Sequence, residues 1–300
     1  GGNMYRRNNL GDKIFMGVVW LILTSFAFIC LYPFYIVIIN SFSNPDAVLG
    51  DMALVLPREP TLINYVEVIT RNNIFKPFFV SVARTVIGTI LSVTGCSMLA
   101  YGLTKKELPF RKLMYRILVF SMYISAGAIP VYVTFTKYGF RNNFLVYVIP
   151  GMISVYNMIL VKVFIEQLPA EVEESAMIDG ANYYQIFFRI ILPVITPITA
   201  TIATFTAVAQ WNSWVDNLWY CSDKNLETLQ LMLLNFVQSQ SMNLSEAARL
   251  SGDALKEKLR VNPTSIRMAV TVITITPIML VYPFTQRFFV KGIMIGAVKG

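Results

Sequence analysis

The residues with the clearest chemical pattern lie in one stretch from Leu168 to Pro193, LPAEVEESAMIDGANYYQIFFRIILP. Carboxylates gather just after Pro169, where they would complement the positive end of a helix that begins there. Gly180 is the residue type that most often follows the last turn of a helix. The pattern therefore predicts a short acidic helix from Glu171 to about Asp179. A second helix is expected from about Asn182 to Leu192, ending before Pro193.

The composition of the first helix indicates what it contacts. Helices that lie flat on a bilayer carry lysine and arginine on their polar face, whereas this helix carries carboxylates. Its apolar residues Met177 and Ile178, together with those of the second helix, cannot all face the thin membrane surface. The pattern therefore favours docking to a soluble partner over binding to the bilayer.

A second group of candidate residues combines aromatic rings with amides. Amide side chains in hydrocarbon need hydrogen-bond partners or a wet cavity, although tryptophan and tyrosine at a membrane interface are often simple anchors. Aromatic faces and amide hydrogen bonds suit a neutral, hydroxyl-rich ligand. We therefore expect a solute path lined by Tyr156, Asn157, Gln210, Trp211, Asn212 and Trp214.

Several other chemistries have little support in the sequence. The chain contains no histidine, the commonest general base and metal ligand. Its three cysteines, Cys30, Cys96 and Cys221, have neither metal-ligand nor disulfide-framework spacing. There is no Gly-x4-Gly-Lys-Ser/Thr phosphate loop. We expect no catalytic residue, metal or cofactor in this chain, which leaves an intramembrane enzyme without machinery.

The composition places these residues in a membrane protein. Hydrophobic residues make up 55% of the 300 residues and charged residues 14%, whereas about 25% of a soluble domain is charged. The net charge of +8 is spread between apolar runs. That distribution favours loops held at anionic headgroups over nucleic-acid binding.

The apolar runs predict an all-α protein with six transmembrane helices, each of about the length that crosses hydrocarbon. They are Ile14–Ile39 (bent near Pro33), Phe78–Leu103, Leu113–Val133, Phe144–Val161, Val194–Val215 and Met268–Phe284. Basic residues in the short connections place both termini in the cytoplasm. Arg84 is expected to snorkel to the outer headgroups. Because no span has a carboxylate at mid-depth, any uphill transport should be driven from outside the bilayer.

The expected domain organisation follows from these spans. Residues 1–13 form a cytoplasmic segment, of which residues 1–3 are interpreted as an addition to the natural N-terminus. Residues 14–290 form the transmembrane domain, and residues 291–300 form a cytoplasmic tail. The domain includes the docking loop 166–193 and an outer loop 216–267, where helices are expected at Glu227–Val237 and Ser245–Arg260.

The docking loop also carries a family signature. Glu174-Ser175-Ala176, Gly180 and Ile190-Ile191-Leu192-Pro193 stand at the spacing of the signature of binding-protein-dependent ABC importer permeases, with Ser175 in place of an alanine. The chain resembles the carbohydrate class, similar to the smaller maltose-type permease and to oligosaccharide and polyuronate permeases. The segments Gln210–Trp214 and Tyr282–Gly300 carry that part of the resemblance.

The resemblance implies a type I ABC importer permease fold that works by alternating access in the bacterial cytoplasmic membrane. It implies two ATPase partners that bind ATP and Mg²⁺, a second permease, an extracytoplasmic solute-binding protein and surrounding lipid. A carbohydrate is the expected solute, and an amino acid or peptide is the alternative. The implied ATPase-coupling residues are Glu171, Glu174, Ser175, Ala176, Ile178, Asp179, Gly180, Leu192 and Pro193.

Overall fold

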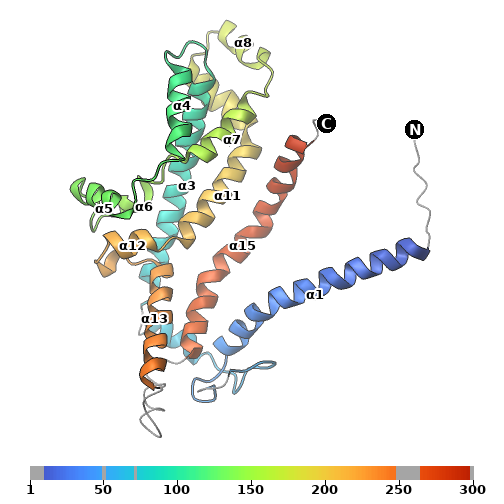
Figure 1. Ribbon diagram of the computed structural model, residues 1–300, viewed down its shortest axis with the longest axis vertical. Coiled ribbons are helices and arrows are strands. Elements are labelled where there is room, and N and C mark those ends of the chain that lie inside the picture. The colour runs from blue at the N-terminus through green and yellow to red at the C-terminus, as the bar shows by residue number, and fades with distance from the viewer. Residues whose placement is uncertain (1–9, 49–51, 71–72, 248–263, 298–300) are drawn as a thin grey trace. The chain divides into compact units, whose positions relative to one another are not determined.

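The computed structural model describes residues 10–48, 52–70, 73–247 and 264–297. Within these ranges the regular structure is entirely helical (Figure 1), as the sequence predicts. The longer helices are α1 (Leu10–Ser41), α3 (Phe75–Thr104), α4 (Arg111–Ser121), α5 (Ala128–Lys137), α7 (Val155–Ile165), α11 (Thr196–Asn212), α13 (Leu229–Ala247) and α15 (Thr264–Ala297). The short ones are α2 (Ile63–Thr70), α6 (Leu145–Val148), α8 (Glu171–Ile178), α9 (Tyr183–Ile186), a π-helical turn (Phe187–Ile191), α10 (Leu192–Val194), α12 (Val215–Tyr220) and a 3₁₀ turn (Lys224–Leu226).

The chain divides into two compact units, residues 1–72 with 236–273 and residues 73–235 with 274–300. In the first unit, two buried amides hold the segment that follows α1. Asn40 donates to the Ala53 carbonyl at 2.8 Å and accepts from the Ala53 N–H at 2.9 Å, and Asn64 donates to the Ser41 and Ser43 carbonyls at 2.8 Å each. These bonds satisfy backbone groups that burial would otherwise leave unpaired.

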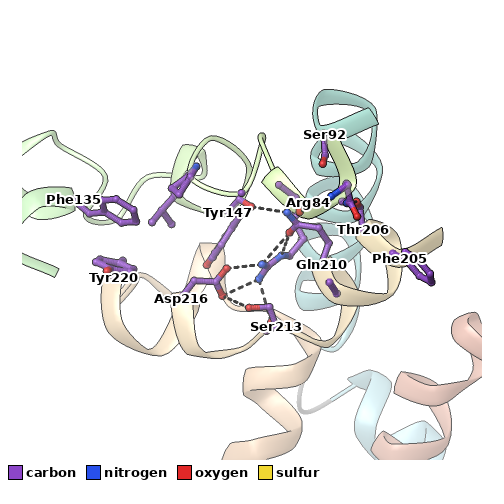
Figure 2. Close-up of a pocket in the computed structure, with 16 residues that line it drawn as sticks. Arg84, Ser92, Phe135, Tyr147, Phe205, Thr206, Gln210, Ser213, Asp216 and Tyr220 are labelled. Carbon is purple, nitrogen blue, oxygen red and sulfur yellow. Dashed lines mark hydrogen bonds and ion pairs between the residues drawn. The ribbon is translucent and has the colours of Figure 1, made fainter. Parts of the chain in front are cut away.

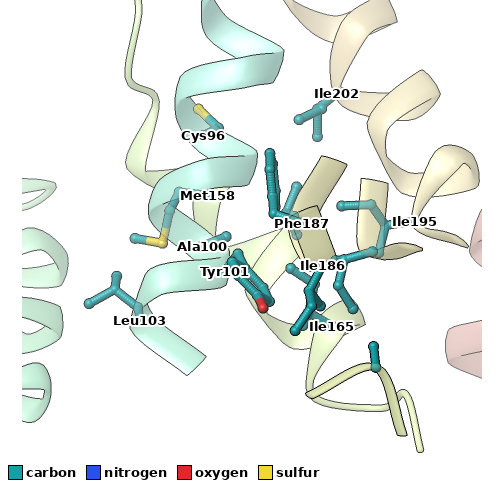
Figure 3. Packing of buried hydrophobic residues seen from close by; sticks show 13 residues of the cluster. Cys96, Ala100, Tyr101, Leu103, Met158, Ile165, Ile186, Phe187, Ile195 and Ile202 are labelled. Carbon is teal, nitrogen blue, oxygen red and sulfur yellow. The ribbon is translucent and has the colours of Figure 1, made fainter. Parts of the chain in front are cut away.

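The core of the second unit forms where α3 packs along both α7 and α11 (Figures 1 and 3). Small side chains on α3 allow this close approach. Cys96 and Ala100 are fully buried against Met158 and Val161 of α7 and Ile202 of α11. Helix–helix contacts inside a membrane typically use small residues in this way.

Three described helices are long and apolar enough to cross a bilayer: Gly11–Ser41, Phe75–Thr104 and Thr264–Val281. A fourth crossing is possible if Tyr183–Val194 and Thr196–Asn212, which meet at 81°, form one broken span. α1 is continuous past Pro33, and none of its apolar window is buried, as expected for a helix that faces lipid or another subunit.

Two predicted spans are not single helices. Leu113–Val133 is divided between α4 and α5, where Gly127 adopts φ +82° just before α5. Phe144–Val161 is divided between α6 and α7 around Pro150-Gly151, a pair that lacks one backbone N–H and favours a turn. The prediction of one continuous helix is wrong at both places, and the count of six crossings stays a prediction.

The predicted helix end before Pro193 is also wrong. Helical backbone continues through Pro193 to Val194, because the π-helical turn Phe187–Ile191 alters the hydrogen-bond pattern that proline would otherwise interrupt. The chain turns at Ile195 instead. α13 contains the predicted helix Glu227–Val237 from Leu229 onward, and most of the predicted Ser245–Arg260 helix lies outside the described residues.

Candidate functional site: a docking helix and a polar cavity

α8 has the boundaries that its sequence predicts. Glu171, Glu173 and Glu174 occupy its first turn. At its other end the Ala181 N–H bonds the Ala176 carbonyl and the Gly180 N–H bonds the Met177 carbonyl, both at 3.0 Å. This is the Schellman pattern, which needs a left-handed residue, and Gly180 supplies it with φ +80°. Gly180 therefore ends the helix at no steric cost.

The two sides of α8 differ. Ala176 is buried in the core cluster that contains Ile186 and Phe187, so it seats the helix on the transmembrane core. Glu174 and Ser175 are exposed, and Ile178 is 85% exposed. Because Ser175 points outward, its replacement of an alanine disturbs no packing.

The segment after α8 holds the remaining predicted coupling residues. Asn182 and Gln185 form a reciprocal capping box at the start of α9, with bonds of 2.9 and 3.0 Å, which fixes the direction of the chain after Gly180. Asp179 and Pro193 are exposed, and Leu192 is half-buried. Their role in coupling stays a prediction.

The second unit also contains a cavity of about 470 Å³ between α3, α5, α6, α7, α11 and α12 (Figure 2). Its polar lining includes Arg84, Asn157, Gln210 and Asp216. Its aromatic lining consists of Phe135, Tyr147, Phe205 and Tyr220. Burial raises the pKa of Tyr220 above its ordinary value, and a tyrosine is protonated at neutral pH even without that shift, so its hydroxyl can donate.

Arg84 does not snorkel, contrary to the sequence prediction, since the residue is only 1% exposed. Its guanidinium makes a two-pronged ion pair with Asp216, at 3.1 and 2.5 Å. It donates twice to the Gln210 side-chain oxygen and once to the Ser213 carbonyl, and it lies 4.5 Å from the centre of the Tyr147 ring (Figure 2). These partners offset the cost of burying the charge.

Gln210 connects this ion pair to the surrounding helices. Its side-chain amide donates to the Tyr147 carbonyl at 3.1 Å. A Cβ atom at Gly88 would lie 2.7 Å from that amide nitrogen. A larger residue at this point of α3 would therefore displace the Gln210 side chain from its bonds.

The six predicted path residues do not share one site. Asn157 and Gln210 line the cavity, and Asn157 donates to Thr206 at 3.3 Å. Trp211 lies in an apolar groove with residues of α3 and α15, where its N–H donates to the Thr274 carbonyl at 3.0 Å. Asn212, Trp214 and Tyr156 are at least partly exposed.

Sequence reasoning missed Arg84 and Asp216 as partners. A signal was available. A lone arginine lies within one apolar run and a lone aspartate at the end of another, and opposite charges in an apolar environment are expected to pair. Their separation of 132 positions gave no local hint of contact.

Residues 94–295 match the family model described as "Binding-protein-dependent transport system inner membrane component". The chain belongs to this family. It is 34% identical to the polygalacturonan/rhamnogalacturonan transport system permease protein YtcP of Bacillus subtilis (strain 168), over 96% of this chain and 99% of the relative. It is 33% identical to Protein LplC of the same organism, over 98% and 97% of the two chains.

A solved structure supports the assignment of this permease to the fold. The permease matches a chain in a crystal structure of a bacterial ABC transporter involved in the import of the acidic polysaccharide alginate. The TM-score is 0.82 at 26% identity, and the match covers 94% of the permease and 98% of that chain. The type I importer permease fold implied by the docking-loop signature is thereby confirmed.

Proposed function

We propose that this permease is one of two membrane subunits of an ATP-driven importer that carries an oligosaccharide into a bacterial cell. The relatives named above for polygalacturonan/rhamnogalacturonan and alginate favour a carbohydrate. So does 25% identity to the arabinooligosaccharides transport system permease protein AraQ of Halalkalibacterium halodurans. These relatives give no support to the amino acid or peptide that the sequence left open.

The observation that carries the proposal is the two-sided docking helix. α8 is seated on the core through Ala176 and presents Glu174, Ser175 and Ile178 outward. A large apolar side chain that is 85% exposed beside carboxylates fits a cleft on a soluble protein. We assign that cleft to an ATPase subunit, one of two in the complex, which would bind ATP and Mg²⁺.

The solute would cross between this permease and a second, homologous one, after delivery by an extracytoplasmic binding protein. The cavity offers the amides of Asn157 and Gln210 beside tyrosine rings, the groups that hydrogen-bond and stack on sugars. ATP binding would draw the docking helices together and open the path outward, and hydrolysis would reset it. Both termini and α8 then lie on the cytoplasmic side.

The proposal is tested on the complex purified with its neighbouring subunits. Ile178→Arg should abolish recovery of the ATPase, because the new charge meets the partner's cleft without disturbing the core. Phe110→Asn is the matched control. Phe110 is 78% exposed in another predicted cytoplasmic connection with φ +56°, a conformation that asparagine tolerates. Failure of the unsubstituted permease to bring down an ATPase would refute the proposal.

The solute is tested in proteoliposomes that contain the complex and its binding protein. Neutral oligosaccharides, uronate oligosaccharides, amino acids and peptides are offered in turn, and ATP-dependent accumulation is measured. We expect accumulation of an oligosaccharide. Accumulation of an amino acid or peptide alone would overturn the choice of solute while leaving the importer assignment in place.

A further inference from the structure

Besides the buried Ala176, one acidic residue, Glu173, ties the docking helix to the transmembrane core. Its carboxylate accepts a hydrogen bond from the Tyr101 hydroxyl at 2.8 Å and forms an ion pair with Lys105 through both oxygens. Tyr101 and Lys105 belong to the cytoplasmic end of α3 and the residue just beyond it. Glu173 thus contacts α3 directly, while its neighbour Glu174 is exposed.

This contact is shielded from water. The Lys105 and Glu173 side chains are 16% and 19% exposed, and the lysine nitrogen lies 4.1 Å from the centre of the Tyr101 ring. Shielded, charge-assisted bonds are stronger than those of an exposed pair. The Lys162–Glu166 pair differs, because it joins residues four positions apart and its glutamate is 47% exposed, although its lysine is 14% exposed.

Tyr101 also joins a third element. Its ring lies 5.4 Å from the ring of Phe187 in the π-helical turn, inside the same buried cluster (Figure 3). We call Tyr101, Lys105 and Glu173 the α8–α3 clamp. These residues lie where α3 meets both α8 and the π-helical turn that follows α8 in the chain.

Farther toward its N-terminus, α3 also lines the cavity, at Arg84. α3 is one unbroken helix of 30 residues, and 17 positions separate Tyr101 from Arg84, about 26 Å at the helical rise. Arg84 holds Asp216 and Gln210 at the cavity wall. Because α3 is continuous and is held by charge-assisted bonds both at Tyr101–Lys105 and at Arg84, a shift of α8 that moves Tyr101 also moves Arg84.

We propose that Glu173, Tyr101 and Lys105 are positioning residues that transmit the movement of the docking helix through α3 to the Arg84–Asp216 network at the cavity. This inference rests on the proposed function. It adds a separate step to docking, in which the docked α8 must stay bonded to α3 through Glu173. Without the clamp, α8 would still bind its ATPase but would slide against α3 when the ATPase closes.

The test uses the complete complex in proteoliposomes and measures solute accumulated per ATP hydrolysed. Glu173→Gln keeps an acceptor for Tyr101 and removes the ion pair, and Lys105→Met removes the same charge interaction from the other side. Both variants should retain the ATPase subunits and hydrolyse ATP, while solute moved per ATP falls by about two- to thirtyfold, the range of known coupling changes. Glu59→Gln changes an exposed carboxylate outside the docking loop, and a glutamine oxygen can still accept the Asn44 bond that Glu59 accepts, so the ratio should stay unchanged.

Rescue separates transmission from simple loss of structure. The charge-swapped variant Glu173→Lys with Lys105→Glu should recover much of the ratio that each single change loses. Tyr101→Phe, which removes only the hydroxyl, should lower the ratio less than Glu173→Gln.

An unchanged ratio in both Glu173→Gln and Lys105→Met would overturn the inference. Loss of the ATPase subunits from these variants would also overturn it, because Glu173 would then act in docking. Absence of ATPase from the unsubstituted complex would instead count against the proposed function.

Discussion

Replacing Asp216 with asparagine should destabilise the permease, because it leaves the Arg84 charge without a carboxylate. Removing one partner of a buried ion pair costs about 3–5 kcal/mol. The Asp216 side chain is 23% exposed while that of Arg84 is 2% exposed, so water screens part of the loss. Asparagine also keeps one acceptor oxygen. Both facts place the expected cost at the lower end, about 3 kcal/mol.

The expected change in melting temperature follows from chain length. Unfolding entropy is about 2.1 cal/mol/K per residue, which gives about 0.6 kcal/mol/K for 300 residues. A loss of about 3 kcal/mol then lowers Tm by about 5 °C. The assay is thermal unfolding of the purified complex followed by tryptophan fluorescence. Glu166→Gln is the control, and the loss of its i,i+4 pair with Lys162, whose glutamate is 47% exposed, should shift Tm by about 1 °C or less.

The double variant Arg84→Met with Asp216→Asn distinguishes an unpaired charge from lost contacts. Once neither charge is present, no ion remains uncompensated, so the double variant should be more stable than Asp216→Asn alone. A Tm for Asp216→Asn within 1 °C of the parent would refute the reasoning. So would a double variant whose loss equals the sum of the two single losses.

Three further substitutions test other parts of the site. Gly88→Ala should cost about 1–3 kcal/mol of stability, measured as a lowered Tm, because the new methyl group displaces the Gln210 amide. Gly95→Ala, whose Cβ would meet nothing closer than 3.6 Å, should be tolerated, and equal losses of Tm in the two variants would contradict this role of Gly88. Gly180→Val should lower the solute accumulated per ATP, because valine is strained at a φ of +80°, whereas Gly180→Asn should retain coupling. Normal coupling in the valine variant would count against the proposed docking of α8. Trp211→Phe should lower stability by about 1 kcal/mol through the lost bond to the Thr274 carbonyl, but uptake should stay close to normal because the ring lies in the apolar groove. Abolished uptake would place Trp211 on the solute path.

The docking helix could be predicted because its signals are local. Carboxylates in the first turn and Gly180 after the last one act within two turns of chain, and α8 ends where they indicate. The broken helices near Gly127 and Pro150 were harder to foresee. The apolar runs there satisfy the length requirement for a span, and only the backbone conformation decides where the helix is interrupted.

The cavity could be predicted only in part, because its residues come from distant segments. Neighbours in α11 show the difficulty. Gln210 and Trp211 are adjacent in the sequence, yet a helix turns about 100° per residue, so one faces the cavity and the other faces the groove. The neighbour that each face of α11 contacts depends on the packing of α3, α6 and α15. A single sequence does not reveal that packing.

The hydrogen bonds of Arg84 bear on what the cavity can recognise. A guanidinium has five N–H donors, and the five bonds from Arg84 to Gln210, Ser213 and Asp216 match that number. A solute carboxylate would have to compete with Asp216 for donors that are already engaged. The network therefore mainly holds α3, α11 and the start of α12 together. On the proposed mechanism, a movement of α3 would strain these bonds and so link the docking helix, near the Tyr101 end of α3, to the shape of the cavity.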